Sequence, residues 1–191
     1  RGTVSEGIVR VDNECFVQPK ATISWGWRTS QRGREISIEA EGRTIRVEAD
    51  RQGRIPLLSA LSQLGAQTEW NTDGTKLRVY GSIRQFDVSG GTVTLSSTLS
   101  FSPQSFTLDS PDRLVMDLPG TRLSPGLNAP SEGKVRIRQF TADTVRLVVE
   151  SPGITKLQPN LNVSRSLEIT VTNLNEGTSI LNAGGNKTTS P

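Results

Sequence analysis

Five charged side chains on two predicted strands are the best candidates for binding chemistry in this sequence. Arg113 and Asp117 are four residues apart on a strand-like run, so the two-residue side-chain period of a strand places both on one face. They could form a structural ion pair with each other, or hydrogen-bond the hydroxyl and carboxylate groups of a ligand. Lys134, Arg136 and Arg138 alternate along a second run and predict a small cationic stripe. An ordinary solvent-facing strand would show the same stripe, so both interpretations stay open.

Tryptophans provide a second kind of candidate site. Trp25 and Trp27 share a face if their segment is extended, and exposed aromatic rings stack against the apolar faces of sugars. For at least Trp70, which lies beside a predicted turn, we expect packing in a core instead. The sequence therefore predicts Trp25 and Trp27 as the more exposed pair.

Most catalytic chemistry is excluded by what the sequence lacks. There is no histidine, which rules out Ser-His-Asp and Cys-His nucleophiles and the usual histidine-bearing catalytic zinc site. The single cysteine, Cys15, cannot form an intrachain disulfide, and we expect it to be a small buried hydrophobe. Carboxylate pairs and a Ser-Lys dyad remain, but acidic residues such as Glu39, Glu41 and Glu48 alternate along strands or flank turns. We expect this part of the protein to be non-catalytic and to hold no cofactor or metal.

Charge and hydropathy limit the possible partners. The 22 basic and 19 acidic residues give a formal charge of +3 without a long block of one sign, and aromatic residues make up only 5% of the chain. Nucleic-acid binders usually combine a concentrated basic patch with aromatic stacking groups, so we expect no nucleic-acid partner. No apolar run approaches the roughly 20 residues that a membrane-spanning helix needs. We expect no membrane span.

These candidates must be positioned by the elements of two predicted domains. In residues 1–81 the alternation of 36–39 and 44–47 around Glu41-Gly42 predicts a hairpin. Residues 57–64 have helical spacing, with Pro56 in the first turn and Gly65 at the end, and strands 67–70 and 76–80 follow. This pattern predicts a small α+β domain, an antiparallel sheet with one helix.

Residues 82–174 predict an all-β sandwich, and residues 175–191 a flexible linker. The tetrapeptide Ile-Arg-Gln-Phe occurs at 83–86 and again at 137–140, which indicates a duplicated β unit. Strands are expected at 83–86, 92–95, 105–108, 113–118, 135–140, 145–149 and 167–171. The chain as a whole is therefore predicted to be mainly β.

Two family resemblances extend this interpretation. The stretch from Ile55-Pro56-Leu57-Leu58 through Leu64-Gly65-Ala66 to Trp70 and Val79 resembles the copper amine oxidase N-terminal-like domain of bacterial surface proteins. That likeness covers about residues 35–80 and implies a twisted antiparallel sheet against one helix, with no copper site despite the name.

Residues 110–120, Ser-Pro-Asp-Arg-Leu-Val-Met-Asp-Leu-Pro-Gly, with Arg138-Gln139-Phe140 and Thr144 to Val148, resemble the AMIN domain. That family supplies the N-terminal localisation module of bacterial N-acetylmuramoyl-L-alanine amidases and also occurs in type IV pilus secretins. The resemblance implies a sandwich of two similar sheets that attaches to peptidoglycan. The Ser96-Ser97-Thr98 segment departs from the family pattern, which distinguishes the first sheet from the second.

The leading hypothesis is a non-catalytic region that binds peptidoglycan or another anionic wall polymer in the bacterial periplasm or cell envelope. The parent protein would be an amidase whose zinc hydrolase domain follows the linker. The alternative is a protein-interaction module of a secretin-like assembly, which docks on envelope proteins through its sheet edges. A carboxylate-based glycosidase is the third possibility, and it would show turnover on muropeptides.

Overall fold

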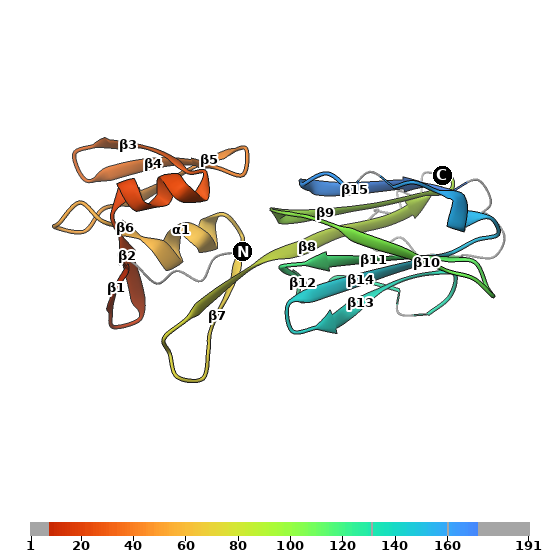
Figure 1. Cartoon of the computed structure of the whole chain (residues 1–191). Coiled ribbons are helices and arrows are strands. Elements are labelled where there is room, and N and C mark those ends of the chain that lie inside the picture. Colours follow the sequence, from red (N-terminus) through yellow and green to blue (C-terminus); the bar gives the residue numbers. More distant parts are fainter. Residues whose placement is uncertain (1–7, 131, 160, 172–191) are drawn as a thin grey trace, which may run out of the picture.

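The chain folds into two β-rich parts joined by one long strand. The structure, a computed structural model, describes residues 8–130, 132–159 and 161–171. Strands account for 56% and helices for 10% of these residues, which confirms a mainly β protein with an α+β part followed by a sandwich. Each part has its own cluster of buried apolar side chains, one formed within residues 15–77 and the other within residues 83–171. Figure 1 shows the two parts lying end to end, with β8 running from one into the other. The predicted linker, 175–191, lies outside the described residues.

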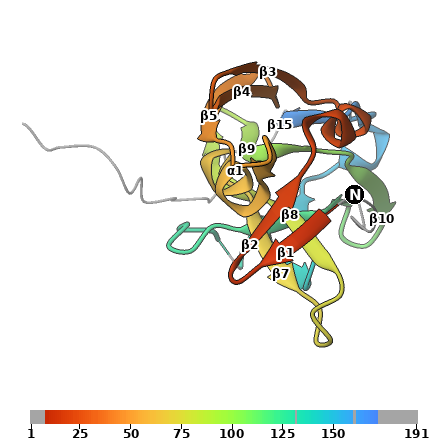
Figure 2. The same cartoon turned by 90° about the vertical axis from the view of Figure 1, so that its left-hand side faces the viewer.

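The N-terminal part consists of two small sheets with a helix between them. One sheet has the order β1-β2-β6 and the other the order β3-β4-β5. Figure 2 looks onto this end of the molecule and shows α1 between the β3–β5 sheet and the β1–β2 hairpin. The elements are β1 Ile8–Val11, β2 Glu14–Val17, the 3-10 helix η1 Pro19–Trp25, β3 Arg28–Arg32, β4 Glu35–Ala40, β5 Arg43–Glu48, β6 Ile55–Pro56, α1 Leu57–Gln63 and β7 Gln67–Trp70.

The predicted hairpin and helix are both confirmed. In β4, Ile36 and Ile38 are fully buried while the alternate residues face outward, and β4 pairs with β5 in antiparallel register. Glu41 and Gly42 both have positive φ values, 53° and 65°, as the tight turn between two twisted strands requires.

Helix α1 is only seven residues long and is stabilised at both ends by other parts of the chain. At its start, the Glu14 carboxylate of β2 accepts hydrogen bonds from the backbone N–H groups of Leu58 and Ser59, at 2.7 and 3.2 Å. At its end, Gly65 adopts φ +74°, and Ala66 N donates to Leu61 O at 2.9 Å. This closing geometry uses the left-handed conformation that glycine adopts without a steric penalty.

Strand β8 (Leu77–Ser89) crosses the expected domain boundary without a break. The separate strands predicted at 76–80 and 83–86 are therefore one strand, whose first part pairs with β7 and whose second part pairs with β9. Gly81 has an extended backbone and does not end the strand. A Cβ atom at this position would lie 2.5 Å from Ser97 Oγ, so glycine permits the close approach of β9.

The C-terminal part is a sandwich of two sheets around the second core. One sheet has the order β12-β8-β9-β15, with β12 parallel to β8, and the other has the order β10-β11-β14-β13 and is antiparallel throughout. A short 3-10 helix, η2, precedes the last described strand. The elements are β9 Thr92–Phe101, β10 Gln104–Leu108, β11 Arg113–Pro119, β12 Thr121–Leu123, β13 Val135–Thr141, β14 Thr144–Glu150, η2 Ile154–Lys156 and β15 Ser164–Thr170.

The two copies of Ile-Arg-Gln-Phe lie in different sheets, and each belongs to the first strand of a hairpin, β8–β9 and β13–β14. Ile83 and Ile137 both point into the sandwich core. The register shifts after Ile83 in the first copy but only around Phe140 in the second. A bulge inserts one residue and reverses which face the next side chain takes, so Phe86 packs on the core whereas Phe140 is 44% exposed.

Polar contacts fix the junction between the two parts. Arg43 Nη2 donates to Leu64 O at the end of α1 and to Thr98 O of β9, at 2.6 and 2.7 Å. Glu41 Oε2, in the β4–β5 turn, accepts hydrogen bonds from Ser100 N and Ser100 Oγ, at 2.9 and 2.6 Å. Thr98, the last residue of the segment that departs from the family pattern, therefore lies at this junction, and its carbonyl binds the N-terminal part.

Candidate functional site

The outward face of the β10-β11-β14-β13 sheet gathers four of the predicted charged residues together with two exposed aromatic rings. The inward face of the same sheet carries core residues such as Leu114, Met116 and Leu147. Along each strand, the outward-facing side chains alternate with these core residues. We call the outward surface the cation-aromatic face and define it by Phe106 of β10, Arg113, Val115 and Asp117 of β11, Arg146, Val148 and Glu150 of β14, and Arg136, Arg138 and Phe140 of β13.

The strand register arranges this face in rows that run across the sheet. One row is Gln104, Asp117, Arg146 and Arg138, and the next is Phe106, Val115, Val148 and Arg136. Facing Cβ atoms in such rows are about 5 Å apart, so neighbouring side chains within a row are in contact range. The face thus combines a charged row with an apolar row that ends in a cation.

Asp117 forms its ion pair with Arg146 and not with Arg113. Arg146 Nε and Nη2 donate to the two carboxylate oxygens of Asp117 at 2.7 and 2.8 Å, and both side chains are only about one-fifth exposed, at 19% and 20%. Of the two interpretations that the sequence left open, the Arg113–Asp117 ion pair does not form, because four residues along a strand span about 13 Å, whereas the facing residue on the next strand is about 5 Å away. Arg113 Nε instead donates to Pro111 O at 3.3 Å.

Arg146 is held between two aromatic rings as well. Its guanidinium carbon lies 3.4 Å from the centre of the Phe140 ring and 5.6 Å from the centre of the Phe106 ring. The hydrogen bonds to Asp117 raise the pKa of Arg146 above its ordinary value, against the opposing effect of partial burial. Both rings remain 44% exposed, so each presents an apolar surface to solvent.

Sequence reasoning did not select Arg146 as a site residue. Its only signal was a cation in the middle of an otherwise apolar strand, and its role depends on the register between β11 and β14, which is a tertiary property. Phe106 and Phe140 were missed for the same reason. When the position of a bulge is not known, sequence reasoning assigns an aromatic residue in a strand to the core.

The predicted stripe on β13 is partly compensated by neighbouring groups. Arg136 Nη1 donates to Gly133 O at 2.6 Å, and its Nη2 lies 3.9 Å from Glu150 Oε2. Lys134 directly precedes β13, and its carbonyl accepts a hydrogen bond from Glu150 N at 2.7 Å. The Arg138 side chain has no hydrogen bond, ion pair or ring contact within the described ranges, and it faces Arg146 directly across the strands.

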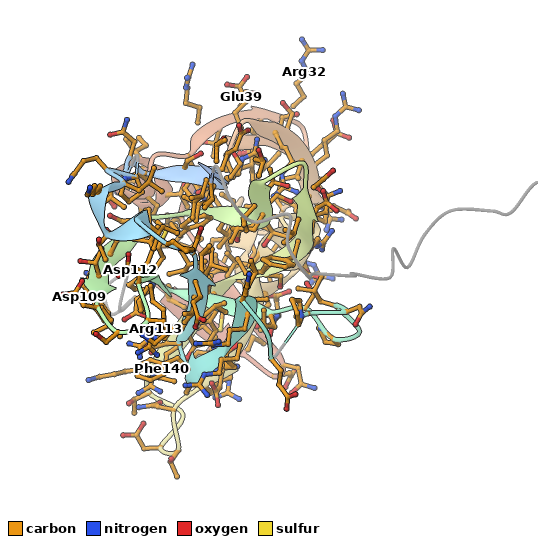
Figure 3. All side chains as sticks on the ribbon, turned by 90° about the vertical axis from the view of Figure 1, so that its right-hand side faces the viewer. Arg32, Glu39, Asp109, Asp112, Arg113 and Phe140 are labelled. Atoms are coloured by element: carbon orange, nitrogen blue, oxygen red, sulfur yellow. The ribbon has the colours of Figure 1, made fainter. Side chains whose placement is uncertain are left out.

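Figure 3 shows the location of this face on the molecule. Arg113 and Phe140, which belong to the face, lie at the lower left of the molecule in this view. Arg32, an arginine of the N-terminal β3 strand, projects from the top. The outward side of the opposite sheet is different in character. There Ser96 Oγ donates to Gln85 Oε1 at 3.0 Å, and Thr92 and Thr170 oxygens are 3.5 Å apart. The two sheets of the sandwich therefore present unlike surfaces.

The two predicted tryptophans lie in the N-terminal part, away from the charged candidates. Trp25 ends helix η1, Gly26 follows with φ +79°, and Trp27 is only 8% exposed in the N-terminal core. The rings are 5.6 Å apart and nearly perpendicular, at 88°. The expectation that both share an exposed strand face is wrong, because the segment is helical and turns at Gly26. Core packing accounts for Trp27.

Cys15 is fully buried, as expected. Burial raises the pKa of the Cys15 thiol, with a further contribution from the neighbouring Glu14 carboxylate.

Within the described ranges, no group of three or more acidic or cysteine side chains is placed to bind a metal ion. In the same residues, no helix has the length and apolar character that crossing a membrane requires.

Comparison with known proteins assigns a family to the sandwich. Residues 82–173 match the family model of the AMIN domain, and this range includes every residue of the cation-aromatic face. AMIN domains are peptidoglycan-associated localisation modules of cell-envelope proteins. No curated protein and no solved structure matches the chain. The AMIN resemblance is thus confirmed for the second part, and the copper amine oxidase N-terminal-like resemblance of the first part stays a prediction.

Proposed function

We propose that this chain is the non-catalytic wall-binding region of a periplasmic protein, and that the cation-aromatic face of its AMIN domain binds peptidoglycan. The face supports this proposal by combining two kinds of binding group. The exposed rings of Phe106 and Phe140 suit the apolar faces of sugars, and the cations beside them suit the carboxylates of stem peptides. The paired Asp117 and Arg146 stiffen the centre of the sheet and leave the flanking groups accessible.

The parent protein, in this proposal, is an N-acetylmuramoyl-L-alanine amidase whose zinc hydrolase domain lies elsewhere in the polypeptide. Weak contacts repeated along a polymer raise the local concentration of a tethered enzyme without changing its chemistry. A localisation module with no catalytic residues of its own suits that division of labour. The zinc ligands would then belong to the hydrolase domain.

A co-sedimentation experiment with purified sacculi tests the binding proposal. We expect the wild-type chain to sediment with sacculi and Phe106→Ser to do so several-fold less, because the variant removes an exposed ring from the face. Ile23→Ser is the matched control, since Ile23 is an exposed apolar residue, 67% accessible, of the N-terminal part. If wild-type protein stays in the supernatant, or if both variants bind like wild type, the face is not the binding site.

The alternative function is a docking module in a secretin-like assembly, and one observation favours it. Strand β10 is at the end of its sheet, and Phe106 and Leu108 are exposed along it, at 44% and 40%. An open edge of this kind can accept a strand from a partner protein. Binding to envelope proteins in extracts that have been freed of peptidoglycan, with no binding to sacculi, would favour this alternative.

A further inference from the structure

On the basis of the proposed peptidoglycan binding, we infer that Arg138 recognises a free carboxylate of the stem peptide. The row that runs Asp117, Arg146, Arg138 across three strands carries this inference. Along this row one anion is followed by two cations, on three adjacent strands. The anion is already fully engaged with the nearer cation.

The charge balance of that row leaves Arg138 without a counter-ion. Arg146 donates from Nε and Nη2 to the two oxygens of Asp117, so both carboxylate oxygens are engaged. Like charges that face each other across an antiparallel pair destabilise the sheet, and here Arg138 faces Arg146. Within the described residues, the Arg138 guanidinium has no hydrogen-bond acceptor. An anionic group supplied by a ligand would relieve this imbalance.

The surroundings of Arg138 favour a carboxylate on a short aliphatic chain. Phe140, two residues along β13, places an exposed ring beside the guanidinium of Arg146 and extends the apolar surface next to this position. A planar guanidinium binds a carboxylate through two parallel hydrogen bonds. In intact wall the lactyl carboxyl groups of the glycan are amide-linked to the stems, so the free carboxylates attached to aliphatic residues are those of the peptide stems.

A two-way comparison tests the inference with the full chain. One axis is the protein, as wild type, Arg138→Gln, or the control Arg32→Gln, which alters an exposed strand arginine far from the face (Figure 3). The other axis is the sacculus, either untreated or with its carboxylates converted to neutral methylamides. Binding constants come from co-sedimentation at low salt.

We expect Arg138→Gln to bind untreated sacculi about fivefold more weakly than wild type, the size expected when one exposed charge-assisted contact is lost. Carboxylate blocking should weaken the wild type and Arg32→Gln by a similar factor and leave Arg138→Gln unchanged, because the two changes remove the same contact. A free stem peptide should compete with the wild type, and the difference between variants should shrink at high salt.

Other outcomes separate this inference from the proposed function. If wild type binds blocked sacculi as tightly as untreated ones, the carboxylate inference is wrong while wall binding stands. If Arg138→Gln and carboxylate blocking each weaken binding independently of the other, Arg138 binds a different group. Loss of binding only after extraction of phosphodiester polymers from the wall would assign the cations to phosphate instead. If wild type binds neither preparation, both the inference and the proposed function fail.

Discussion

Asp117 and Arg146 are the central pair of the candidate site, and their geometry explains why they belong together. The two side chains meet directly across β11 and β14, with two hydrogen bonds at 2.7 and 2.8 Å. They are partly buried under the rings of Phe106 and Phe140, so the interaction is screened less than an exposed surface pair. Loss of the Asp117 charge leaves Arg146 beside Arg138 without its facing carboxylate on β11.

Asp117→Asn tests the structural role of this pair. We expect the free energy of unfolding to fall by about 1–2 kcal/mol, because the variant loses a charge-assisted bidentate contact and leaves a partly buried cation uncompensated. Urea unfolding followed by circular dichroism measures the change. Asp87→Asn is the matched control, an exposed strand aspartate on the opposite sheet. Equal stability of Asp117→Asn and wild type would show that the pair does not stabilise the fold.

At the scale of single elements, local patterns in the sequence were reliable. The β4–β5 hairpin, helix α1 with Gly65 at its end, and the strands of the sandwich other than β12 follow from side-chain period and turn residues, although β8 was expected as two separate strands. What could not be predicted was which strands lie side by side and where bulges fall. The sequence left an Arg113–Asp117 pair open and gave no sign of the Asp117–Arg146 pair, because the pairing of β11 with β14 joins residues about 30 positions apart.

Gly81 and the Trp25–Trp27 pair show the same limit. A glycine between two strand-like runs normally indicates a break, yet here it allows β9 to approach β8. Two tryptophans one residue apart share a face only in an extended chain, and η1 ends between them. The two Ile-Arg-Gln-Phe copies diverge for a similar reason, since a one-residue bulge decides whether the phenylalanine faces the core or solvent.

Helix α1 illustrates how a short helix depends on its neighbours. Seven residues are too few for a stable isolated helix, so its stability must come from packing and from its caps. We expect Glu14→Ala to lower the free energy of unfolding by about 1–2 kcal/mol, because it removes the acceptor for Leu58 N, Ser59 N and Ser59 Oγ. The comparison variant is Glu48→Ala, which alters an exposed strand glutamate. Equal losses in the two variants would contradict the capping role.

The whole molecule depends on the junction between its two parts. Strand β8 runs through both sheets, and Arg43 joins two carbonyl groups that belong to different parts, Leu64 O and Thr98 O. The cationic side chain also lies at the C-terminal end of α1, where the helix dipole favours positive charge. These contacts hold the face of the sandwich in a fixed orientation relative to the N-terminal part.

Arg43→Ala should separate the unfolding of the two parts. The variant leaves two carbonyl acceptors unpaired, and we expect a loss of about 2 kcal/mol together with a broader thermal transition. Arg46→Ala is the control, because Arg46 is exposed on the same strand and its nearest carboxylate, that of Glu35, is 3.9 Å away. Differential scanning calorimetry distinguishes the cases. A single sharp transition at the wild-type temperature in Arg43→Ala would refute the coupling.

The most direct test of the account is a map of where peptidoglycan touches the chain. Backbone amide NMR spectra of the full chain, titrated with soluble peptidoglycan fragments that carry stem peptides, provide it. We predict that the largest shift changes fall on β10, β11, β14 and β13, around Phe106, Asp117, Arg138 and Phe140. Shift changes centred on Trp25 and Trp70, or on the outward side of β8, β9 and β15, would contradict the proposed binding face.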